Sequence, residues 1–459
     1  MSNQFSQLPL TPALLEALDN QQFKTMTEIQ QKALPDILSE KDVLGQAKTG
    51  SGKTLTFALG LLQKTDTSSF GVQSLVLCPT RELAEQVAEE IRKLGKRMPN
   101  LKVLTLYGGT AIGPQIQSLQ HSAHVIVGTP GRIMDLIDKG HLNLWHVKTL
   151  VLDEADRMLD MGFEEEMTTV IREVPQERQT LLFSATFPES IKRISQDIQR
   201  SPVEVTVTTT HDNKKIEQTF FEVQKEHKTK ATAAVLSEYQ PESCIIFCNT
   251  KVACQELADD LREMGFSAIA LHGDLEQKER NQVIARFSNQ SELIMVATDV
   301  ASRGLDIDGV SLVINYQVAM ESEAHIHRIG RTGRADSEGV AVTLAAPEEI
   351  HFVRAIEELQ QQKAKWKGIQ ALRFHANRII EPKYQTVAID AGKKNKLRPG
   401  DILGALTQDA DIPGDDIGKI KITATHSFVA VKVRSVKRTL NYFKEGKIKG
   451  RRCKARRLA

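Results

Sequence analysis

The stretch that decides the fold is "TLVLDEAD", residues 149–156, in which an apolar run ends in a cluster of acidic residues. The same pattern recurs in "SLVLCPT" (74–80), "HVIVGTP" (124–130), "TLLFSAT" (180–186), "CIIFCNT" (244–250) and "LIMVATD" (293–299). Short continuous apolar runs are typical of strands buried on both faces, as in a parallel sheet. The polar clusters then lie at the carboxyl ends of the strands, where such sheets bind their ligands.

Helical patterns lie between these runs, for example "RELAEQVAEEIRKLGKR" (81–97) and "KVACQELADDLREMG" (251–265). Alternating strands and helices predict a doubly wound α/β fold. The series is interrupted once, by the polar, Thr-rich stretch "TVTTTHDNKK" (206–215). We therefore expect two α/β domains, residues 1–207 and 216–360, joined by a linker at 208–215.

The last part of the chain has a different pattern, which follows an expected helical linker at residues 361–382. "YQTVAIDAG", "GKIKITAT" and "SFVAVKV" resemble strands, and "RPGDILGALTQ" has the features of a helix start. A helix with Val436, Leu440 and Phe443 on one face and a closing strand would complete the order βαββαβ. That order is typical of a small ferredoxin-like α+β domain, here residues 383–459.

Positive charge is concentrated at the end of the chain. The formal net charge is only +2, yet residues 432–459 contain twelve Lys or Arg and one acid, Glu445. The preceding 431 residues contain 48 basic and 57 acidic residues, a net charge of −9. This segregation indicates a polyanionic partner for the C-terminal end. The end is either a disordered basic tail or the charged edge of a folded module. We favour the module because the strand and helix pattern continues into it.

The composition is that of an ordinary globular protein, with 41% hydrophobic and 26% charged residues. No apolar run is long enough for a membrane span, and the N-terminus lacks the features of a signal peptide. The five cysteines have no metal-binding spacing and are expected to be buried or free thiols. We expect a cytoplasmic protein without a membrane partner.

"AKTGSGKT", residues 47–54, is the strongest local signal for a binding site. A glycine-rich turn between a strand and a helix exposes backbone N–H groups that can surround phosphates. Lys53 then reaches the terminal phosphates and Thr54 can bind Mg²⁺. The generic pattern has Gly where this chain has Ala47, so the motif alone leaves a chance glycine-rich turn open.

Asp153 and Glu154 follow a strand about a hundred residues after this loop. Asp153 is expected to bind Mg²⁺, directly or through water, and Glu154 to orient or deprotonate the attacking water. The alternative is an acidic, solvated turn after a strand. A phosphate-binding loop upstream in the same domain favours the catalytic interpretation.

"HIHRIGRTGR" in the second domain supplies Arg328, Arg331 and Arg334. Phosphoryl transfer requires positive charge near the γ-phosphate, and Arg331 and Arg334 on one helical face could supply it. A solvated basic helix is the alternative. If the arginines and the phosphate loop belong to one site, closure of the two domains must complete that site.

Ten motifs together resemble those of the DEAD-box RNA helicases, in the family order and over nearly all of residues 1–350. They are "FKTMTEIQ", "AKTGSGKT", "PTRELA", "GG", "TPGR", "DEAD", "SAT", "IIFCNT", "ATDVASRGLD" and "HRIGRTGR". Ala47 agrees with the family pattern A-x-T-G-x-G-K-T. The resemblance implies two tandem RecA-like domains, an RNA-dependent ATPase and helicase activity, and ATP and Mg²⁺ as cofactors.

The resemblance also implies roles for residues around the nucleotide. Gln30 would read the adenine edge and Phe23 would pack on the ring, with Phe5 as the isolated upstream aromatic. Asp306 would contact the ribose. Ser184 and Thr186 would couple the site to Asp156 and His327. The phosphate loop would consist of Ala47, Lys48, Thr49, Gly50, Ser51, Gly52, Lys53 and Thr54, with Arg331 and Arg334 as arginine fingers.

RNA phosphates and sugars would be held at both domains. The first would use Thr80, Arg81, Gly109, Thr129, Gly131 and Arg132, and the second Asn249, Gly273 and Thr298. Two departures from the family pattern put the details of the adenine pocket in doubt. Gln22 replaces the usual Gly, and Thr25-Met26 stands where Pro is frequent.

The C-terminal domain resembles an RNA-recognition motif, and its attachment to this core resembles the bacterial DbpA type. That type recognises a hairpin of 23S ribosomal RNA and acts in assembly of the large ribosomal subunit, which makes pre-50S particles the expected partner. Usual RNA-recognition motifs stack bases on sheet aromatics. Here the first-strand stretch "TVAIDAG" has none and the third strand offers only Phe428. We therefore expect binding through the basic residues Lys447, Lys449, Arg451, Arg452 and Lys454.

Two other functions stay open at this point. An ATP-gated RNA clamp without physiological unwinding would have nearly the same sequence. A DNA translocase could use the same tandem domains, although "DEAD" together with "FKTMTEIQ", the Q motif of the family, argues against it.

Overall fold

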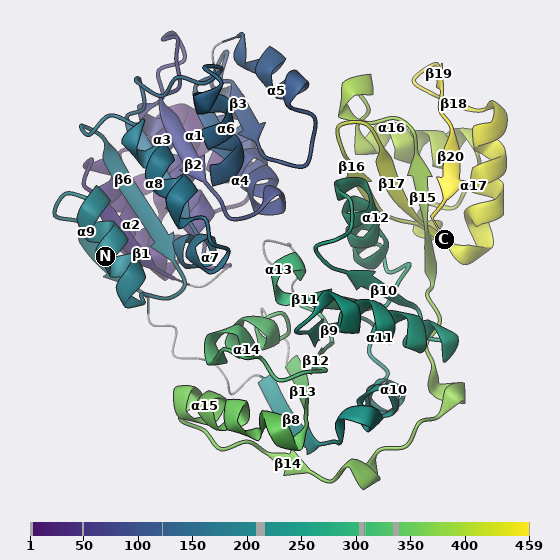
Figure 1. Cartoon of the computed structure of the whole chain (residues 1–459). Coiled ribbons are helices and arrows are strands. Elements are labelled where there is room, and N and C mark those ends of the chain that lie inside the picture. The colour runs from purple at the N-terminus through teal and green to yellow at the C-terminus, as the bar shows by residue number, and fades with distance from the viewer. Residues whose placement is uncertain are drawn as a thin grey trace. The chain divides into compact units, whose positions relative to one another are not determined.

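The structure is a computed structural model, and it describes residues 3–47, 50–121, 123–207, 216–302, 307, 309–333 and 339–458. The chain divides into two compact units, Met1–His211 and Asp212–Ala459 (Figure 1). The expected linker at 208–215 lies outside the described residues.

The first unit is a seven-stranded sheet in the order β3-β4-β2-β5-β6-β1-β7, with every pair parallel. Its strands are β1 (Val43–Gln46), β2 (Ser74–Leu77), β3 (Val103–Leu106), β4 (Val125–Gly128), β5 (Thr149–Asp153), β6 (Gln179–Ser184) and β7 (Val203–Thr206). Its helices are α1 (Pro12–Asn20), α2 (Glu28–Leu38), α3 (Lys53–Lys64), α4 (Arg81–Leu94), α5 (Ile112–Leu119), α6 (Pro130–Asp138), α7 (Ala155–Asp160), α8 (Glu164–Arg172) and α9 (Glu189–Ile198). Short 3₁₀ turns lie at η1 (Phe5–Gln7) and η2 (Gly95–Arg97).

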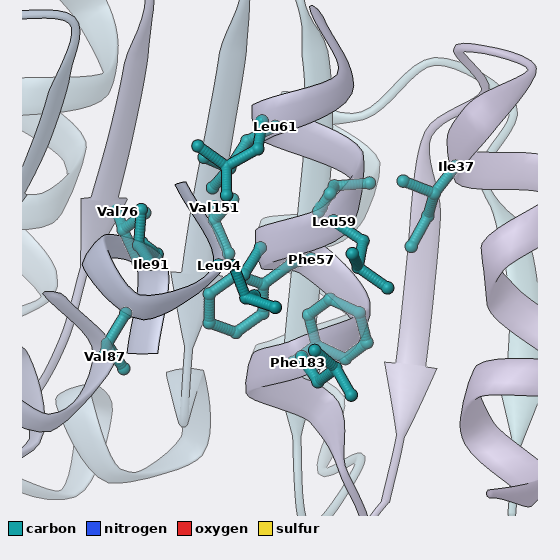
Figure 2. Close-up of a cluster of buried hydrophobic side chains, with 14 of the residues drawn as sticks. Ile37, Phe57, Leu59, Leu61, Val76, Val87, Ile91, Leu94, Val151 and Phe183 are labelled. Carbon is teal, nitrogen blue, oxygen red and sulfur yellow. The ribbon is translucent and has the colours of Figure 1, made fainter. Parts of the chain in front are cut away.

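The core of this unit holds α3 against the sheet (Figure 2). Phe57 of α3 is fully buried, and its ring centroid lies 5.7 Å from that of Phe183 in β6. Ile37 of α2 and Ile91 of α4 belong to the same cluster. Because α3 begins directly after the glycine-rich loop, this packing also fixes the position of that loop.

The second unit begins with another parallel sheet, in the order β10-β11-β9-β12-β13-β8-β14. Its strands are β8 (Ile216–Glu222), β9 (Cys244–Cys248), β10 (Ala268–Leu271), β11 (Ile294–Thr298), β12 (Leu312–Asn315), β13 (Gly339–Ala345) and β14 (Trp366–Lys367). Its helices are α10 (Lys228–Tyr239), α11 (Lys251–Glu263), α12 (Gln277–Ser288), α13 (Asp299–Ser302), α14 (Ser322–Ile329) and α15 (Ile350–Gln360), with 3₁₀ turns η4 (Lys225–His227) and η5 (Pro347–Glu349).

The segment 361–382, expected as a helical linker, contains little helix. It forms the two-residue strand β14 and two single 3₁₀ turns, η6 (Ile369–Ala371) and η7 (Ala376–Arg378). Its apolar residues Ile369, Leu372, Ile379 and Ile380 pack against the core beneath the second sheet. Contacts with the domain surface, rather than internal helical hydrogen bonds, therefore order this segment.

The C-terminal domain has the expected order βαββαβ. Its antiparallel sheet has the strand order β16-β17-β15-β20. The elements are β15 (Tyr384–Ile389), η8 (Lys393–Asn395), α16 (Pro399–Gly404), a π-helical turn η9 (Ala405–Asp409), η10 (Gly414–Asp416), β16 (Ile417–Ile422), β17 (Ser427–Lys432), α17 (Val433–Glu445) and β20 (Ala455–Arg457). A small hairpin of β18 (Lys447–Ile448) and β19 (Arg451–Arg452) precedes the last strand. The basic end therefore belongs to a folded module, and the fold expected from the sequence is confirmed.

Candidate nucleotide and RNA sites

The glycine-rich loop lies between β1 and α3, where two glycines adopt conformations that other residues rarely adopt. Gly50 and Gly52 have φ angles of 82° and 94°. A Cβ added at Gly52 would lie 2.4 Å from Nε2 of Gln30, so a side chain is excluded there. Lys48 and Thr49 lie outside the described residues.

Gln30 and Thr27 hold this loop from α2. Gln30 is buried and donates from Nε2 to the carbonyl of Gly52 at 3.2 Å, while its Oε1 accepts from the Thr27 backbone at 2.7 Å. The Thr27 hydroxyl donates to the carbonyl of Ser51 at 2.7 Å. Phe23 is 39% exposed, whereas Phe5 is buried in the core. Gln30 therefore positions the phosphate loop, in addition to the adenine contact expected of it.

Lys53 and Asp153 form a buried, polar centre at the carboxyl end of the sheet. Lys53 Nζ and Asp153 Oδ1 are buried and have no hydrogen-bond partner among the described residues. Burial raises the pKa of Asp153 to about 7, with Glu154 adding to the shift and Lys53 opposing it. Buried polar atoms without partners are rare in folded proteins unless a ligand or ion satisfies them.

This centre fits a Mg²⁺ ion bound together with phosphates. In the described residues, no cluster of three or more His, Cys, Asp or Glu could hold a metal by itself. Mg²⁺ typically uses one or two carboxylates, with phosphates and water completing the octahedron. Asp153 supplies a carboxylate, and Thr54 lies half-buried in the first turn of α3.

Glu154 lies immediately beyond Asp153 in a strained conformation. Its φ angle is 54°, in the left-handed region, and it caps α7. Its Oε2 accepts from Nη1 of Arg157 at 2.9 Å in an ion pair whose side chains are both nearly buried. The strand end and the arginine together fix this carboxylate, as expected of a group that orients water.

Asp156 connects the DEAD and SAT motifs. Its Oδ2 accepts from the Thr186 hydroxyl at 2.9 Å and from the backbone N–H groups of Thr186 and Ala185 at 3.0 and 3.1 Å. The Ser184 hydroxyl donates to the Thr186 carbonyl at 2.7 Å. Burial alone would raise the pKa of Asp156, but Lys53 and the Thr186 hydrogen bonds hold it below its usual value. The structure thus brings together Ser184, Thr186 and Asp156.

The residues expected to hold RNA on the first domain follow three adjacent strands. Thr80 follows β2 and caps α4, Gly109 follows β3, and Thr129 follows β4 and precedes α6. Gly109 has φ 71°, and a Cβ there would lie 1.8 Å from Nη1 of Arg81. Arg81 therefore passes directly over the glycine.

Gly131 and Arg132 lie in the first turn of α6, beside the same edge. The space where a Cβ would extend from Gly131 is open. Arg132 Nη2 donates to the carbonyl of Thr110 at 3.1 Å, and its buried Nη1 has no partner within the described residues. All six predicted residues thus gather at one edge of one sheet.

Three residues of the second domain lie at strand ends. Asn249 follows β9, Gly273 follows β10, and Thr298 is the last residue of β11. Gly273 is exposed, with open space around it. Asn249 already has structural partners, because Nδ2 donates to the Val318 carbonyl at 3.0 Å and Oδ1 accepts from Arg328 at 2.7 Å. Its side chain therefore also holds the domain together.

The three arginines of "HIHRIGRTGR" have different environments. Arg328 is fully buried and donates twice to Asp299, each at 2.7 Å, so it is a structural hub. Arg331 is buried too, but α14 ends at Ile329, so the expectation that it shares a helical face with Arg334 is wrong. His327 lies half-buried on α14. Arg334 and Asp306 lie outside the described residues.

The basic residues expected to bind RNA are exposed on the hairpin and in the short segment between the hairpin and β20. They are Lys447, Lys449, Arg451, Arg452 and Lys454. Phe428, by contrast, is 5% exposed and packs with Ala388, Leu458 and Ala285 of α12. Beside it, Thr386 accepts from Asn289 at 3.2 Å and lies 2.5 Å from the Ser291 hydroxyl. Phe428 is therefore not an exposed stacking surface.

Sequence reasoning missed three groups in these sites: Thr27, Arg157 and the Arg328–Asp299 pair. Arg157 lies three residues after Glu154, a spacing that brings side chains together on a helix, so its pairing could have been found. Asp299 stands inside "ATDVASRGLD", but its pairing with Arg328 depends on the neighbouring positions of β11 and α14. Only the fold reveals that contact.

Comparison with known proteins agrees with this geometry. The family model described as DEAD/DEAH box helicase matches residues 27–194, the helicase conserved C-terminal domain matches 227–336, and the DbpA RNA binding domain matches 386–457. The ATP-dependent RNA helicase DbpA of Escherichia coli K12 is 50% identical over 449 residues, covering 98% of each chain. The chain belongs to the DEAD-box ATP-dependent RNA helicase family.

Two further similar proteins match about four-fifths of this chain. The helicase CshA of Geobacillus kaustophilus is 44% identical over 360 residues, covering 78% of this chain and 77% of its own. The structure of Saccharomyces cerevisiae Dbp5 bound to RNA and ADP BeF3 matches with a TM-score of 0.73 and 30% identity, over 80% of this chain and 96% of that chain.

This DEAD-box helicase thus combines a family ATPase core with a DbpA-type RNA-binding domain. It binds ATP and RNA. Among the described residues, no helix is long and apolar enough to cross a membrane. All five cysteines are buried and free, as expected.

Proposed function

We propose that this helicase separates short RNA duplexes beside a hairpin of 23S ribosomal RNA during assembly of the large ribosomal subunit. The observation that carries the proposal is the DbpA-type domain, which continues into an exposed basic hairpin. Core contacts to phosphate and sugar carry little sequence information, so selection of one RNA needs a separate domain. The proposed partners are this hairpin of 23S ribosomal RNA and the pre-50S particles that contain it.

In the proposed reaction, Lys53 binds the terminal phosphates and Thr54 and Asp153 hold Mg²⁺. When bound, Mg²⁺ would neutralise negative charge on the phosphates. Glu154, held by Arg157, orients the attacking water and accepts its proton. Arg331 and Arg334 of the second domain contribute positive charge to the transferring phosphate.

The Asp156–Thr186 hydrogen bonds are proposed to carry the state of the nucleotide to the RNA. Thr186 lies in the loop after β6, two residues from Ser184, and Asp156 lies in the helix that Glu154 caps. Glu154 is two residues from Asp156, and Asp156 is hydrogen-bonded to Thr186 of the SAT motif. A movement of Glu154 on ATP hydrolysis can therefore be passed to the SAT motif. His327 is the proposed partner of this motif in the second domain.

The proposal is tested by ATP hydrolysis in the presence of ribosomal RNA fragments. The full chain should be stimulated more strongly by the 23S fragment that carries the cognate hairpin than by an unrelated hairpin of equal length. Residues 1–382, which retain Ile379 and Ile380 on the core, should hydrolyse ATP without that preference. An unchanged preference in the shortened chain would assign RNA selection to the core and contradict the proposal.

A further inference from the structure

The segment 361–380, here called the strap, crosses the second domain as a fixed part of its surface. The Lys365 carbonyl accepts from the Phe220 backbone at 2.9 Å, and β14 pairs with β8. Further along, the Arg373 carbonyl accepts from the Ser237 hydroxyl at 3.1 Å, and Arg378 pairs with Glu238 at 2.9 Å. The strap therefore forms a defined wall against which a groove can persist.

A groove of about 810 Å³ lies between the strap and α10. This volume is within the usual range of ligand sites, about 300–1,000 Å³. Its walls include Trp366 and Phe374 from the strap and Lys230 from α10. None of these residues belongs to the motifs that bind nucleotide or RNA in the family core.

Two aromatic rings in this groove are partly exposed and supported from behind. Trp366 is 43% exposed and packs on Phe220 with centroids 5.7 Å apart, while Phe374 is 42% exposed and packs on Phe266 at 6.0 Å. A ring fixed on one side and open on the other is suited to stacking with a planar ligand. Nucleobases stack on such side chains whatever their sequence.

The charge of the strap indicates a polyanion as the ligand. Residues 361–380 contain five Lys or Arg and no Asp or Glu, and three of them, Lys363, Lys367 and Arg378, pair with acids outside the strap. Lys230, on the opposite wall, is exposed and forms no ion pair with any described residue. Clustered cations beside exposed aromatic rings are the usual features of single-strand nucleic acid binding. Glu222 is the one acid that lines the groove.

The position of the groove fits RNA that leaves the core. The groove lies at the carboxyl end of β8, and Asn249 follows the carboxyl end of β9 in the same parallel sheet. Three strand steps separate β9 from β8, or about 14 Å at the usual strand spacing. A strand of RNA held at the core could therefore continue to the groove within a few nucleotides.

We propose that the strap groove binds single-stranded RNA, with a base stacked on Trp366 and phosphates near Lys230 and Lys367. This inference rests on the proposed RNA helicase function and adds a second holding point for one strand. Such a point would keep a released strand on the second domain and would be independent of the C-terminal hairpin.

The two tryptophans of the chain allow a direct test. Trp145 lies in the first domain and is 75% exposed, so Trp145→Phe should fold normally and leave Trp366 as the single indole. Titration of this variant with a short oligouridylate, without nucleotide, should quench its fluorescence to saturation. Trp366→Phe, which keeps Trp145, should show no quenching.

Contact is checked by charge reversal and by crosslinking. In the Trp145→Phe background, Lys230→Glu should weaken binding in the fluorescence titration about tenfold. Lys96→Glu, at an exposed position in the first domain, is the matched control and should leave it unchanged. Irradiation with an oligouridylate containing 5-bromouridine should produce an adduct on the peptide that contains Trp366.

The outcomes separate this inference from the proposed function. RNA-stimulated ATP hydrolysis and anisotropy of a labelled oligouridylate are measured on the same samples. If hydrolysis and anisotropy both show RNA binding while Trp366 is neither quenched nor crosslinked, the groove inference is wrong and the proposed function stands. If RNA never stimulates hydrolysis, the proposed function itself fails. Quenching by polyglutamate but not by oligouridylate would assign the groove to an acidic protein segment and overturn the inference.

Discussion

Two neighbouring carboxylates in the first domain have opposite surroundings. Asp153 has an unsatisfied buried oxygen and a raised pKa, whereas Glu154 is held by Arg157. A carboxylate oxygen without a protein partner is available to a metal, and a carboxylate with a fixed orientation is suited to positioning water. Their order in the sequence suggested these roles, and the structure adds the Arg157 ion pair that distinguishes them.

Glu154→Gln should stop turnover while leaving ligand binding largely intact. The amide keeps the size of the side chain and an oxygen for Arg157 but cannot accept a proton. The rate of ATP hydrolysis should fall at least about 100-fold, while the dissociation constants for ATP and RNA change little. Glu165→Gln, at an exposed position on α8, serves as the control. Hydrolysis at the parental rate would remove Glu154 from the mechanism.

His325 should make the second domain sensitive to acid. Burial lowers its pKa to about 3, with Arg328 adding to the shift. In the unfolded chain the pKa of His325 is near 6.5, so the unfolded state is protonated first as the pH falls. The stabilisation that neutral, buried His325 gives the folded state is therefore complete above pH 6.5 and is lost as the pH falls toward 3. Between pH 7 and 5 the free energy of unfolding should fall by about 2 kcal/mol from this group.

The measurement uses Trp366 fluorescence in the Trp145→Phe chain during urea unfolding at both pH values. His325→Gln should lose most of the pH dependence that this group contributes. His351→Gln, at an exposed position, should retain it. Equal pH dependence in the two variants would show that His325 is not the responsible group.

At the scale of elements, α3 links the core to the phosphate loop. Its packing on β6 through Phe57 and Phe183 fixes where Lys53 begins the helix. The apolar runs and glycine pattern were enough to predict this strand, loop and helix. β14 and the 3₁₀ turns of the strap were not predictable, because short segments ordered by tertiary contacts carry no periodic pattern. The end of α14 before Arg331 was also missed, although Gly330 follows Ile329 directly and glycine commonly ends helices.

Phe57→Ala should destabilise the first domain and weaken ATP binding together. Removing a fully buried ring should lower the free energy of unfolding by about 3–5 kcal/mol through lost burial and the cavity left behind. Urea unfolding followed by Trp145 fluorescence measures the first effect, and nucleotide titration the second. Phe70→Ala is the control because Phe70 is 82% exposed. Equal stability of the two variants would contradict the packing described for α3.

At the scale of the whole molecule, we propose that selection of RNA and hydrolysis of ATP belong to different domains. The charge segregation in the sequence predicted a polyanion-binding end, and the structure places that end in a folded module with exposed basic residues. The sequence could not reveal that Phe428 packs with Ala285 of α12, because that contact joins segments far apart in the chain.

Reversing two charges in the C-terminal hairpin should remove RNA selection without affecting the core. Arg451→Glu with Arg452→Glu changes exposed residues of a two-residue strand, so the fold should be preserved. Affinity for the cognate hairpin should fall at least about tenfold, while stimulation of ATP hydrolysis by oligouridylate stays at the parental level. Lys192→Glu with Arg193→Glu, on α9, is the matched control. Equal losses for the hairpin and for oligouridylate would contradict the division of roles.

The most direct measurement is strand displacement on a short RNA duplex placed beside the 23S hairpin. The account predicts release of the labelled strand with ATP, little release without nucleotide, and none with Glu154→Gln. It also predicts slower release when an unrelated hairpin replaces the cognate one. RNA binding and ATP hydrolysis without any strand release would instead indicate an ATP-gated clamp and contradict the account.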